Sequence, residues 1–202
     1  MTEEEKRLAG YLYKANAQDI EMRRAYSVDL SFQYNRLDYR TQQRERDEMI
    51  HKEMRHAGIR CDIKGPFFCD FWERVTIGNF FSANYNFTIL AGNDVVIGNH
   101  VLIGPNVGIY AAGHAVGLKL RNMDYEYARP VYIGNSVWIG GSVSIMSGVS
   151  IGDGAIIGAG SVVIHDIPAN VLAVGNPCRV VRVLSAEDDN KYKSSAGRTF
   201  EV

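Results

Sequence analysis

Hydrophobic positions in the second half of the chain recur every six residues. From Ile133 the sequence divides into consecutive blocks that each open on Ile or Val: IGNSVW, IGGSVS, IMSGVS, IGDGAI, IGAGSV and VIHDIP. Two earlier blocks, IGNHVL from Ile97 and IGPNVG from Ile103, have the same form, and Val75-Thr76-Ile77-Gly78 indicates a further copy. An amphipathic helix places apolar residues at i, i+3, i+4 and i+7, and this stretch does not.

The six-residue period predicts a mainly β fold in which short strands alternate with tight turns. The Gly and Asn residues that follow many of the Ile residues suit turn positions with special backbone angles. Because stacked repeats bury one continuous core, three blocks are expected to form one coil of a narrow prism. The pattern therefore predicts a parallel β-helix over residues 61–184, but it does not define the hand of the coil.

Residues 1–60 differ in composition, being rich in Glu, Arg, Gln, Lys and Met and poor in Gly. The segments EEEKRLAGYLYK and RTQQRERDEMIHKEMRHAG read as helices, the second ending at Gly58. Their aromatic residues are expected to pack the helices on the solenoid: Tyr11, Tyr13, Tyr26, Phe32 and Tyr34. Residues 185–202 form a polar tail. The expected organisation is a helical segment, a β-helix and a tail.

The repeat breaks over residues 110–132, where the chain reads as a loop extruded from one coil. Long loops inside compact domains are commonly functional. This loop carries His114 between Gly113 and Ala115, which leave the imidazole little steric cover. An isolated His also serves structural roles, so the sequence pattern leaves both a catalytic and a structural role open for His114.

Composition and charge limit the classes of function. The chain has 202 residues, 46% of them hydrophobic, and a formal net charge of -1, which predicts one globular domain without the basic field that nucleic acid or an anionic membrane attracts. Cys61, Cys69 and Cys178 show no spacing typical of a disulfide framework or zinc site. Because the N-terminal segment has no apolar stretch of signal length, a cytoplasmic location is expected.

Several motifs together resemble one enzyme family, the maltose and galactoside O-acetyltransferases of the left-handed β-helix acyltransferase superfamily. The motifs span nearly the whole chain: Leu8-Ala9-Gly10, Tyr34-Asn35, PFFCDF from Pro66, SANYNFTI from Ser82, AAGHAV around His114, VWIGGSV, IGAGSVV and IPANVLAVGNPCRVVR. The resemblance implies a homotrimer with active sites between subunits. It also implies transfer of the acetyl group of acetyl-CoA to a hydroxyl of a sugar-like acceptor.

The resemblance further implies roles for individual residues. His114 is expected to act as general base and Asn84 to orient the acceptor hydroxyl or the developing charge. Gly141 stands where relatives have a serine, and its backbone N–H retains an oxyanion role. Residues expected along acetyl-CoA are Trp138, Gly141, Ala159, Ile164, His165, Arg179 and Arg182, with core packing as the alternative for Trp138 and a solvated terminal segment as the alternative for the two arginines. Residues expected around the acceptor are Arg24, Asp70 and Asn84.

Two departures from the family pattern fall on the acceptor side. Ala91-Gly92 stands where relatives have an acidic residue, and Lys14-Ala15-Asn16 lacks the acidic residue found near the N-terminus of relatives. Asp94 is a possible substitute if the turn is re-shaped. Because Ala91 and Gly92 have no side chain that accepts hydrogen bonds, and Lys14-Ala15-Asn16 has no carboxylate for a second sugar contact, maltose and simple thiogalactosides are expected to be poor acceptors, and a larger or less hydroxylated alcohol a better one.

Two other classes of function remain as alternatives. A zinc hydratase of the γ-carbonic-anhydrase type could use His100, His114 and His165, but their spacing forms no close pair and no metal is expected. A sugar-binding or scaffold β-helix protein without catalytic activity is the second alternative.

Overall fold

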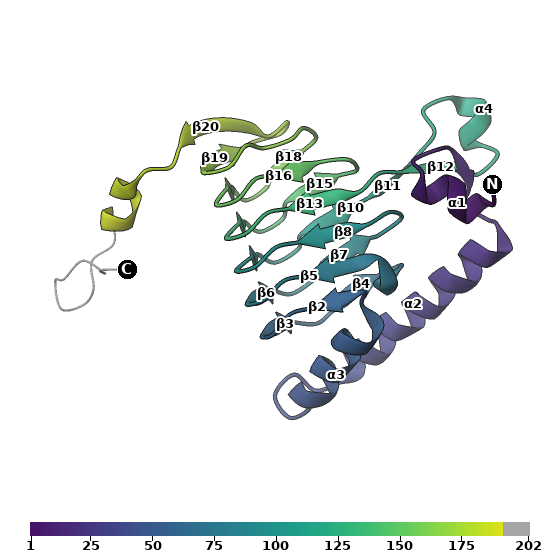
Figure 1. The fold of residues 1–202 in the computed structure, drawn as a ribbon, viewed down its shortest axis with the longest axis horizontal. Helices are drawn as coiled ribbons and strands as arrows, with labels where there is room; N and C mark the ends of the chain where they lie inside the picture. The colour runs from purple at the N-terminus through teal and green to yellow at the C-terminus, as the bar shows by residue number, and fades with distance from the viewer. Residues whose placement is uncertain (192–202) are drawn as a thin grey trace.

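A computed structural model of the chain describes residues 1–191, and the remainder of the predicted tail, residues 192–202, lies outside the described residues. The hexapeptide repeats form a parallel β-solenoid (Figure 1), which confirms the mainly β fold.

The solenoid has three sheets. The first sheet contains β2 (His56–Ala57), β5 (Val75–Ile77), β8 (Val95–Ile97), β13 (Val131–Ile133) and β16 (Ser150–Ile151). The second contains β3 (Cys61–Ile63), β6 (Phe81–Ala83), β9 (Leu102–Ile103), β14 (Trp138–Ile139), β17 (Ile156–Ile157), β19 (Val171–Val174) and β20 (Arg179–Val183). The third contains β4 (Phe67–Cys69), β7 (Phe87–Leu90), β10 (Gly108–Tyr110), β15 (Ser144–Met146) and β18 (Val162–Val163).

The residues that open the blocks stack inside the prism. In the third sheet Ile109 lies beside Ile89 and Ile145, and Ile145 lies beside Val163, and all four side chains are buried. Each coil of three strands therefore contributes one layer of the core. The turns define three corners, named by the sheets they join: first–second, second–third and third–first.

Asparagine side chains satisfy the turn amides at the first–second corner. The Oδ1 atoms of Asn79, Asn99 and Asn135 accept from the backbone N–H of Ile59, Asn79 and Asn99 in the neighbouring coil, at 2.8–3.0 Å. Asp153 continues this ladder by accepting from the Asn135 N–H at 2.7 Å. Each of these bonds joins a side chain of one coil to the backbone of the next, so the Asn that follows many Ile-Gly pairs holds one coil on the next.

The N-terminal region contains α1 (Glu3–Leu8), α2 (Gln18–Arg36) and α3 (Gln43–Glu53); α2 runs from near α1 to α3, which lies at the first-coil end of the solenoid (Figure 1). The predicted helix boundaries were wrong in two places. The first helix stops early because Gly10 has a φ of 77° and Tyr13 begins strand β1 (Tyr13–Lys14). The second ends at Glu53 and not at Gly58, because His56–Ala57 pairs with β5 and so opens the solenoid before residue 61. Helix α2 was not predicted.

Two of the five aromatic residues expected to pack the helices are buried, and Phe32, although half exposed, contacts Phe68 of the solenoid edge-on. Tyr13 and Tyr34 are 0% and 1% exposed, whereas Tyr11, Tyr26 and Phe32 are more than half exposed. Tyr34 donates to the Ile63 carbonyl at 2.7 Å. None of the helices in residues 1–191 combines the length and apolar character that a membrane span requires.

The extruded segment between β10 and β13 is an ordered hairpin. It contains β11 (Ala112–His114), α4 (Leu118–Arg121) and β12 (Tyr125–Ala128). Strand β12 pairs antiparallel with both β11 and β1, so the N-terminal strand completes a small sheet at the third–first corner. Short 3-10 helices occupy Trp72–Arg74 and Ala186–Lys191.

Candidate active site

An open pocket of about 410 Å³ lies at the third–first corner, between α2, the solenoid and the hairpin. It is lined by Arg24, Val28, Asp70, Leu90, Ala112, Gly113, His114 and Glu126. The fold thus brings together three of the residues predicted from the sequence, Arg24, Asp70 and His114, although they are up to 90 positions apart.

His114 faces a carboxylate across the hairpin. It is directly opposite Glu126 in the β11–β12 register, with His114 Nδ1 3.7 Å from Glu126 Oε1. The His114 side chain is 64% exposed, so its imidazole is open to a ligand. A carboxylate beside Nδ1 favours a proton on that nitrogen and leaves Nε2 free to accept one.

A buried tyrosine in turn holds Glu126. Tyr13, in β1, lies opposite Glu126 and donates its hydroxyl proton to Glu126 Oε2 at 2.7 Å. Burial, followed by this hydrogen bond to Glu126, raises the pKa of Tyr13 far above its usual range, so Tyr13 stays a donor at neutral pH. Arg24 Nη2 lies 3.9 Å from the same carboxylate oxygen.

Glu126 was not among the residues predicted from the sequence, and Tyr13 was predicted only to pack. The available signal was the alternation in Tyr125-Glu126-Tyr127, which is typical of a strand and places Glu126 on the face opposite to the two tyrosines. Glu126 lies opposite His114 only because β11 and β12 pair, and the sequence did not predict this pairing.

Asp70 lines the pocket and is half-buried. Its Oδ1 accepts from the Ala91 N–H at 2.6 Å. Burial raises the pKa of Asp70 to about 6, partly offset by that hydrogen bond and by Arg24. Ionised Asp70 therefore opposes folding: the unfolded state loses its proton near pH 4 and the folded state near pH 6, so stability falls as pH rises through this window.

Replacing Asp70 with Asn is expected to stabilise the protein at pH 7.5 by on the order of 2–3 kcal/mol, because the amide keeps the acceptor oxygen and removes the buried charge. At pH 4 the gain should vanish, since Asp70 is then protonated when folded. Urea unfolding at both pH values measures this difference. Asp153→Asn, at an exposed carboxylate that also accepts a backbone N–H, is the control. An equal gain at both pH values would contradict the assignment.

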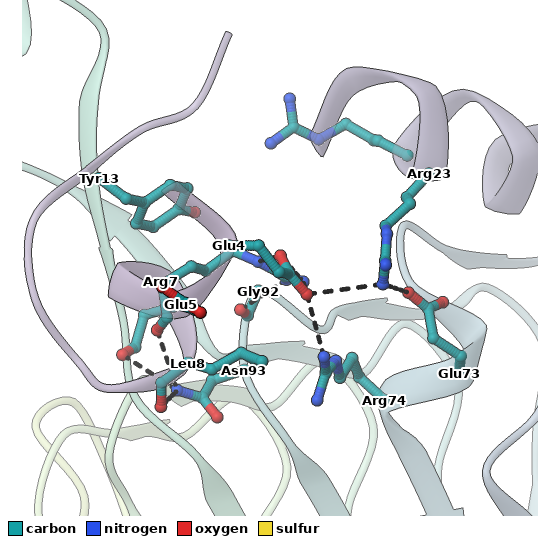
Figure 2. A network of polar contacts seen from close by, with 12 residues as sticks. Glu4, Glu5, Arg7, Leu8, Tyr13, Arg23, Glu73, Arg74, Gly92 and Asn93 are labelled. Atoms are coloured by element: carbon teal, nitrogen blue, oxygen red, sulfur yellow. Dashed lines mark hydrogen bonds and ion pairs between the residues drawn. The ribbon is translucent and has the colours of Figure 1, made fainter. Parts of the chain in front are cut away.

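The N-terminal helix is clamped to the solenoid beside this pocket (Figure 2). Arg7, which is 0% exposed, donates Nε and Nη2 to Glu4 at 2.8 Å and Nη1 to the Gly92 carbonyl at 2.7 Å. Arg74 also donates to Glu4, at 3.0 Å, and the Asn93 amide donates to the Arg7 carbonyl. This clamp fixes the segment that carries Tyr13.

The structure also shows the surroundings of Gly92, where relatives have an acidic residue nearby, and of Asp94, which was considered as its substitute. A Cβ at Gly92 would lie 2.6 Å from the Ala112 Cβ, so the hairpin packs too closely for a side chain there. Asp94 pairs with both guanidinium nitrogens of Arg55 at 2.8 Å and is not among the residues that line the pocket. Asp94 therefore does not replace the missing acidic residue.

The other predicted site residues lie elsewhere on the same chain. Asn84, Gly141 and Ala159 stand at the second–third corner, where the second-sheet strands β6, β14 and β17 end. Ile164 and His165 follow β18 and lie at the third–first corner, two strands beyond the coil from which the hairpin leaves. The expected site therefore divides into two groups on the two corners that flank the third sheet.

Trp138 and the two arginines lie on the outer surface. Trp138 is 52% exposed on the outer face of the second sheet, which excludes core packing. Arg179 and Arg182 belong to β20, in which every residue is exposed, so the alternative of a solvated terminal segment stays open for them. Gly140 and Ser142 donate their N–H groups to the Ile157 and Pro105 carbonyls. Within residues 1–191 the intervening Gly141 N–H has no such acceptor.

The histidines considered for zinc are not gathered. His100 stacks on Phe80 at the first–second corner, with ring centroids 4.6 Å apart, away from His114. In the described part of the chain, no three His, Cys, Asp or Glu side chains are grouped so that they could hold a metal ion.

Comparisons with known proteins agree with this fold. Residues 130–165 match the family described as bacterial transferase hexapeptide (six repeats). Galactoside O-acetyltransferase of Escherichia coli (strain K12) is 36% identical over 184 residues, 91% of this chain and 90% of that protein. The structure of a maltose O-acetyltransferase from Clostridium difficile 630 is 39% identical, with a TM-score of 0.89 over 92% of this chain and 98% of that one. A galactoside acetyltransferase in complex with coenzyme A is 35% identical, with a TM-score of 0.93 over 100% of both chains. The family identified from the sequence motifs is confirmed: this chain belongs to the galactoside and maltose O-acetyltransferases, which are hexapeptide-repeat transferases with a left-handed parallel β-helix.

Proposed function

We propose that this protein transfers the acetyl group of acetyl-CoA to a hydroxyl of a sugar-like acceptor, with His114 as the general base. The observation that carries the base assignment is the chain of contacts from Tyr13 through Glu126 to the exposed imidazole. Membership of the acetyltransferase family, and a relative solved with coenzyme A, support acetyl-CoA as the donor.

The geometry supports transfer of the acetyl group directly from acetyl-CoA to the acceptor hydroxyl. His114 Nε2 takes the proton from the acceptor hydroxyl as its oxygen attacks the thioester carbonyl carbon, and a new C–O bond forms. Glu126 stabilises the imidazolium through Nδ1. The tetrahedral intermediate carries a negative oxygen, to which the unengaged N–H of Gly141 and the amide of Asn84 can donate. Collapse breaks the C–S bond, and the leaving thiolate takes the proton back from His114.

A row of outward-facing side chains across the second sheet supports a binding path for acetyl-CoA on this surface. Trp138 stands next to Ile156, Ile156 next to Leu172, and Leu172 opposite Arg182, all at outward positions. Three strand spacings of about 4.8 Å separate Trp138 from Arg182, roughly 14 Å in total. An apolar path that ends at a guanidinium suits a thioester arm that ends in phosphates.

Changing Arg179 and Arg182 together to Gln is expected to raise the KM for acetyl-CoA roughly tenfold or more and to leave kcat within about threefold, because phosphate contacts are made equally in the ground and transition states. Initial rates at varied acetyl-CoA concentration measure both constants. Arg44→Gln, on the exposed face of α3, is the control. A loss confined to kcat would place these arginines outside the donor site.

We further propose that the active protein is a homotrimer with its sites between subunits. One chain holds His114 and Asn84 on different corners of the prism, so a single copy does not complete the site. The third sheet between these corners carries an outward apolar stripe of Leu90, Tyr110 and Met146, which lie in register, and exposed Ile164 directly follows β18 of the same sheet. A threefold ring brings one corner of each chain to the other corner of its neighbour.

Release of free thiol from acetyl-CoA tests the proposed activity. We expect release that depends on acceptor across glucosides, galactosides, oligosaccharides, aminosugars and chloramphenicol-like alcohols, with an acetyl ester as the product by mass spectrometry. No acceptor-dependent thiol release with any of these classes would contradict it.

A further inference from the structure

A second open pocket lies beside α2, separate from the pocket of His114. It measures about 390 Å³ and is bounded by α2, the end of α3 and the short 3-10 helix that precedes β5. Arg23 and Ser27 line it, whereas their neighbours Arg24 and Val28 line the pocket of His114, and none of the described residues lines both. We call it the α2 pocket. A ligand bound there leaves the site of acetyl transfer free.

The wall of the α2 pocket is mostly apolar. Met22 and Tyr26, one helical turn apart on α2, are 66% and 57% exposed, and buried Leu30 and Trp72 complete the wall. The Trp72 indole N–H already donates to the Ser31 hydroxyl at 3.1 Å. Because an apolar cavity of about 150 Å³ accepts benzene, the α2 pocket has room for a hydrocarbon body of about six carbon atoms.

One carboxylate in this wall lacks a donor. Within residues 1–191 the Oε1 atom of Glu73 is buried and accepts no hydrogen bond, although the side chain as a whole is 41% exposed. The other carboxylate, Glu53, is engaged: it accepts from the Tyr26 hydroxyl at 3.0 Å and pairs with Lys52 at 2.8 Å. Since shielded polar atoms normally have a partner, Glu73 is the place where a donor is missing.

Arg23 does not supply that donor. Figure 2 shows it between two carboxylates, and its Nη1 lies 3.6 Å from Glu4 and 3.9 Å from Glu73. Both distances are longer than a hydrogen bond. The Arg23 side chain is 52% exposed, so it is free to pair with Glu4 alone when another cation takes Glu73. Two carboxylates and one guanidinium give the wall a net charge of -1, which favours a cation over an anion.

We propose that the α2 pocket binds a small organic cation, an ammonium group on a hydrocarbon body of about six carbon atoms. The ammonium donates to the Glu73 carboxylate, and the hydrocarbon body lies against Met22, Tyr26 and Leu30. The tyrosine ring adds an aromatic face that attracts cations. Because a hydrogen bond between two charged groups is about twice as strong as a neutral one, the charge of the ligand decides its affinity.

Three probes of equal length test the sign of that charge. In isothermal titration calorimetry of the full-length protein without acetyl-CoA, hexylammonium should saturate one site per chain and bind roughly tenfold more tightly than 1-hexanol. Hexanoate should bind more weakly than either. Hexanol or hexanoate binding as tightly as hexylammonium, or no saturable binding of hexylammonium, would overturn the proposal.

Two carboxylate variants locate the ammonium group. Glu73→Gln keeps the shape of the side chain and removes its charge, so the affinity for hexylammonium should fall roughly tenfold while that for hexanol stays nearly unchanged. Glu126→Gln removes a carboxylate from the pocket of His114 and should keep the wild-type affinity. Unchanged affinity in Glu73→Gln, or an equal or larger loss in Glu126→Gln, would contradict the assigned place.

A second pair of variants locates the hydrocarbon body. Met22→Ser removes apolar wall and should weaken hexylammonium and hexanol alike, by roughly threefold or more. Ile59→Ser, at the first–second corner and 61% exposed compared with 66% for Met22, should leave both affinities unchanged. Equal affinities in Met22→Ser and in the wild type would show that the hydrocarbon body does not lie along α2.

Discussion

Replacing His114 with Ala lowers kcat by ~10²–10⁴-fold and leaves the KM for acetyl-CoA nearly unchanged, because the imidazole acts on the acceptor proton and not on the donor. The structure supports this because His114 is exposed at the pocket and its Nδ1 faces Glu126. Steady-state rates of thiol release at saturating acetyl-CoA measure the loss.

The control for this variant is His51→Ala, an exposed histidine on α3 that hydrogen-bonds only to the Asp47 carbonyl. It should retain wild-type kcat. Turnover by His114→Ala within about threefold of wild type would contradict the assignment of the base, since a general base contributes far more than this.

Replacing Arg7 with Met lowers the free energy of unfolding by about 3–5 kcal/mol, the usual cost of removing one member of a buried ion pair. The guanidinium is fully buried, 4.2 Å above the Phe71 ring, and it is the donor to the Gly92 carbonyl. Its loss also releases the segment that carries Tyr13, so kcat should fall along with stability.

Urea unfolding at one fixed protein concentration measures the loss, because the stability of an oligomer depends on concentration. The matched control is Lys6→Met, one position away, which breaks a partly exposed ion pair with Glu3 and should cost no more than about 1 kcal/mol. Equal losses in the two variants would show that the clamp does not hold the N-terminal helix.

The sequence pattern predicted the solenoid because each short strand places one Ile or Val in the narrow core. The same apolar position therefore recurs every six residues. The same reasoning missed α2. Its packed face includes Ser27 and Ser31, each 1% exposed, while Met22, Tyr26 and Phe32 are exposed. A helix whose buried face contains serines has no clear apolar stripe, so the hydrophobic pattern does not reveal it.

The hairpin that carries His114 was also not predicted from the local sequence. Its second strand pairs with Tyr13–Lys14, more than 100 residues away in the sequence. Such a partner leaves no periodic signal near His114, so the segment resembled a loop. The roles implied for Arg24, Asp70 and His114 led to one pocket, but no spacing indicated that Asn84 and Gly141 stand on another corner.

The central claim is that His114 of one chain works with Asn84 of its neighbour, and mixing two inactive variants tests it most directly. His114→Ala and Asn84→Ala are each expected to lose nearly all acetyl transfer. In a ring of three equal interfaces, co-assembled chains at equal amounts recreate the intact pair at about one interface in four. Thiol release by the mixed assembly should therefore recover to roughly one quarter of the wild-type rate. A mixture as inactive as its two components, although light scattering shows a mixed trimer, would contradict the shared site.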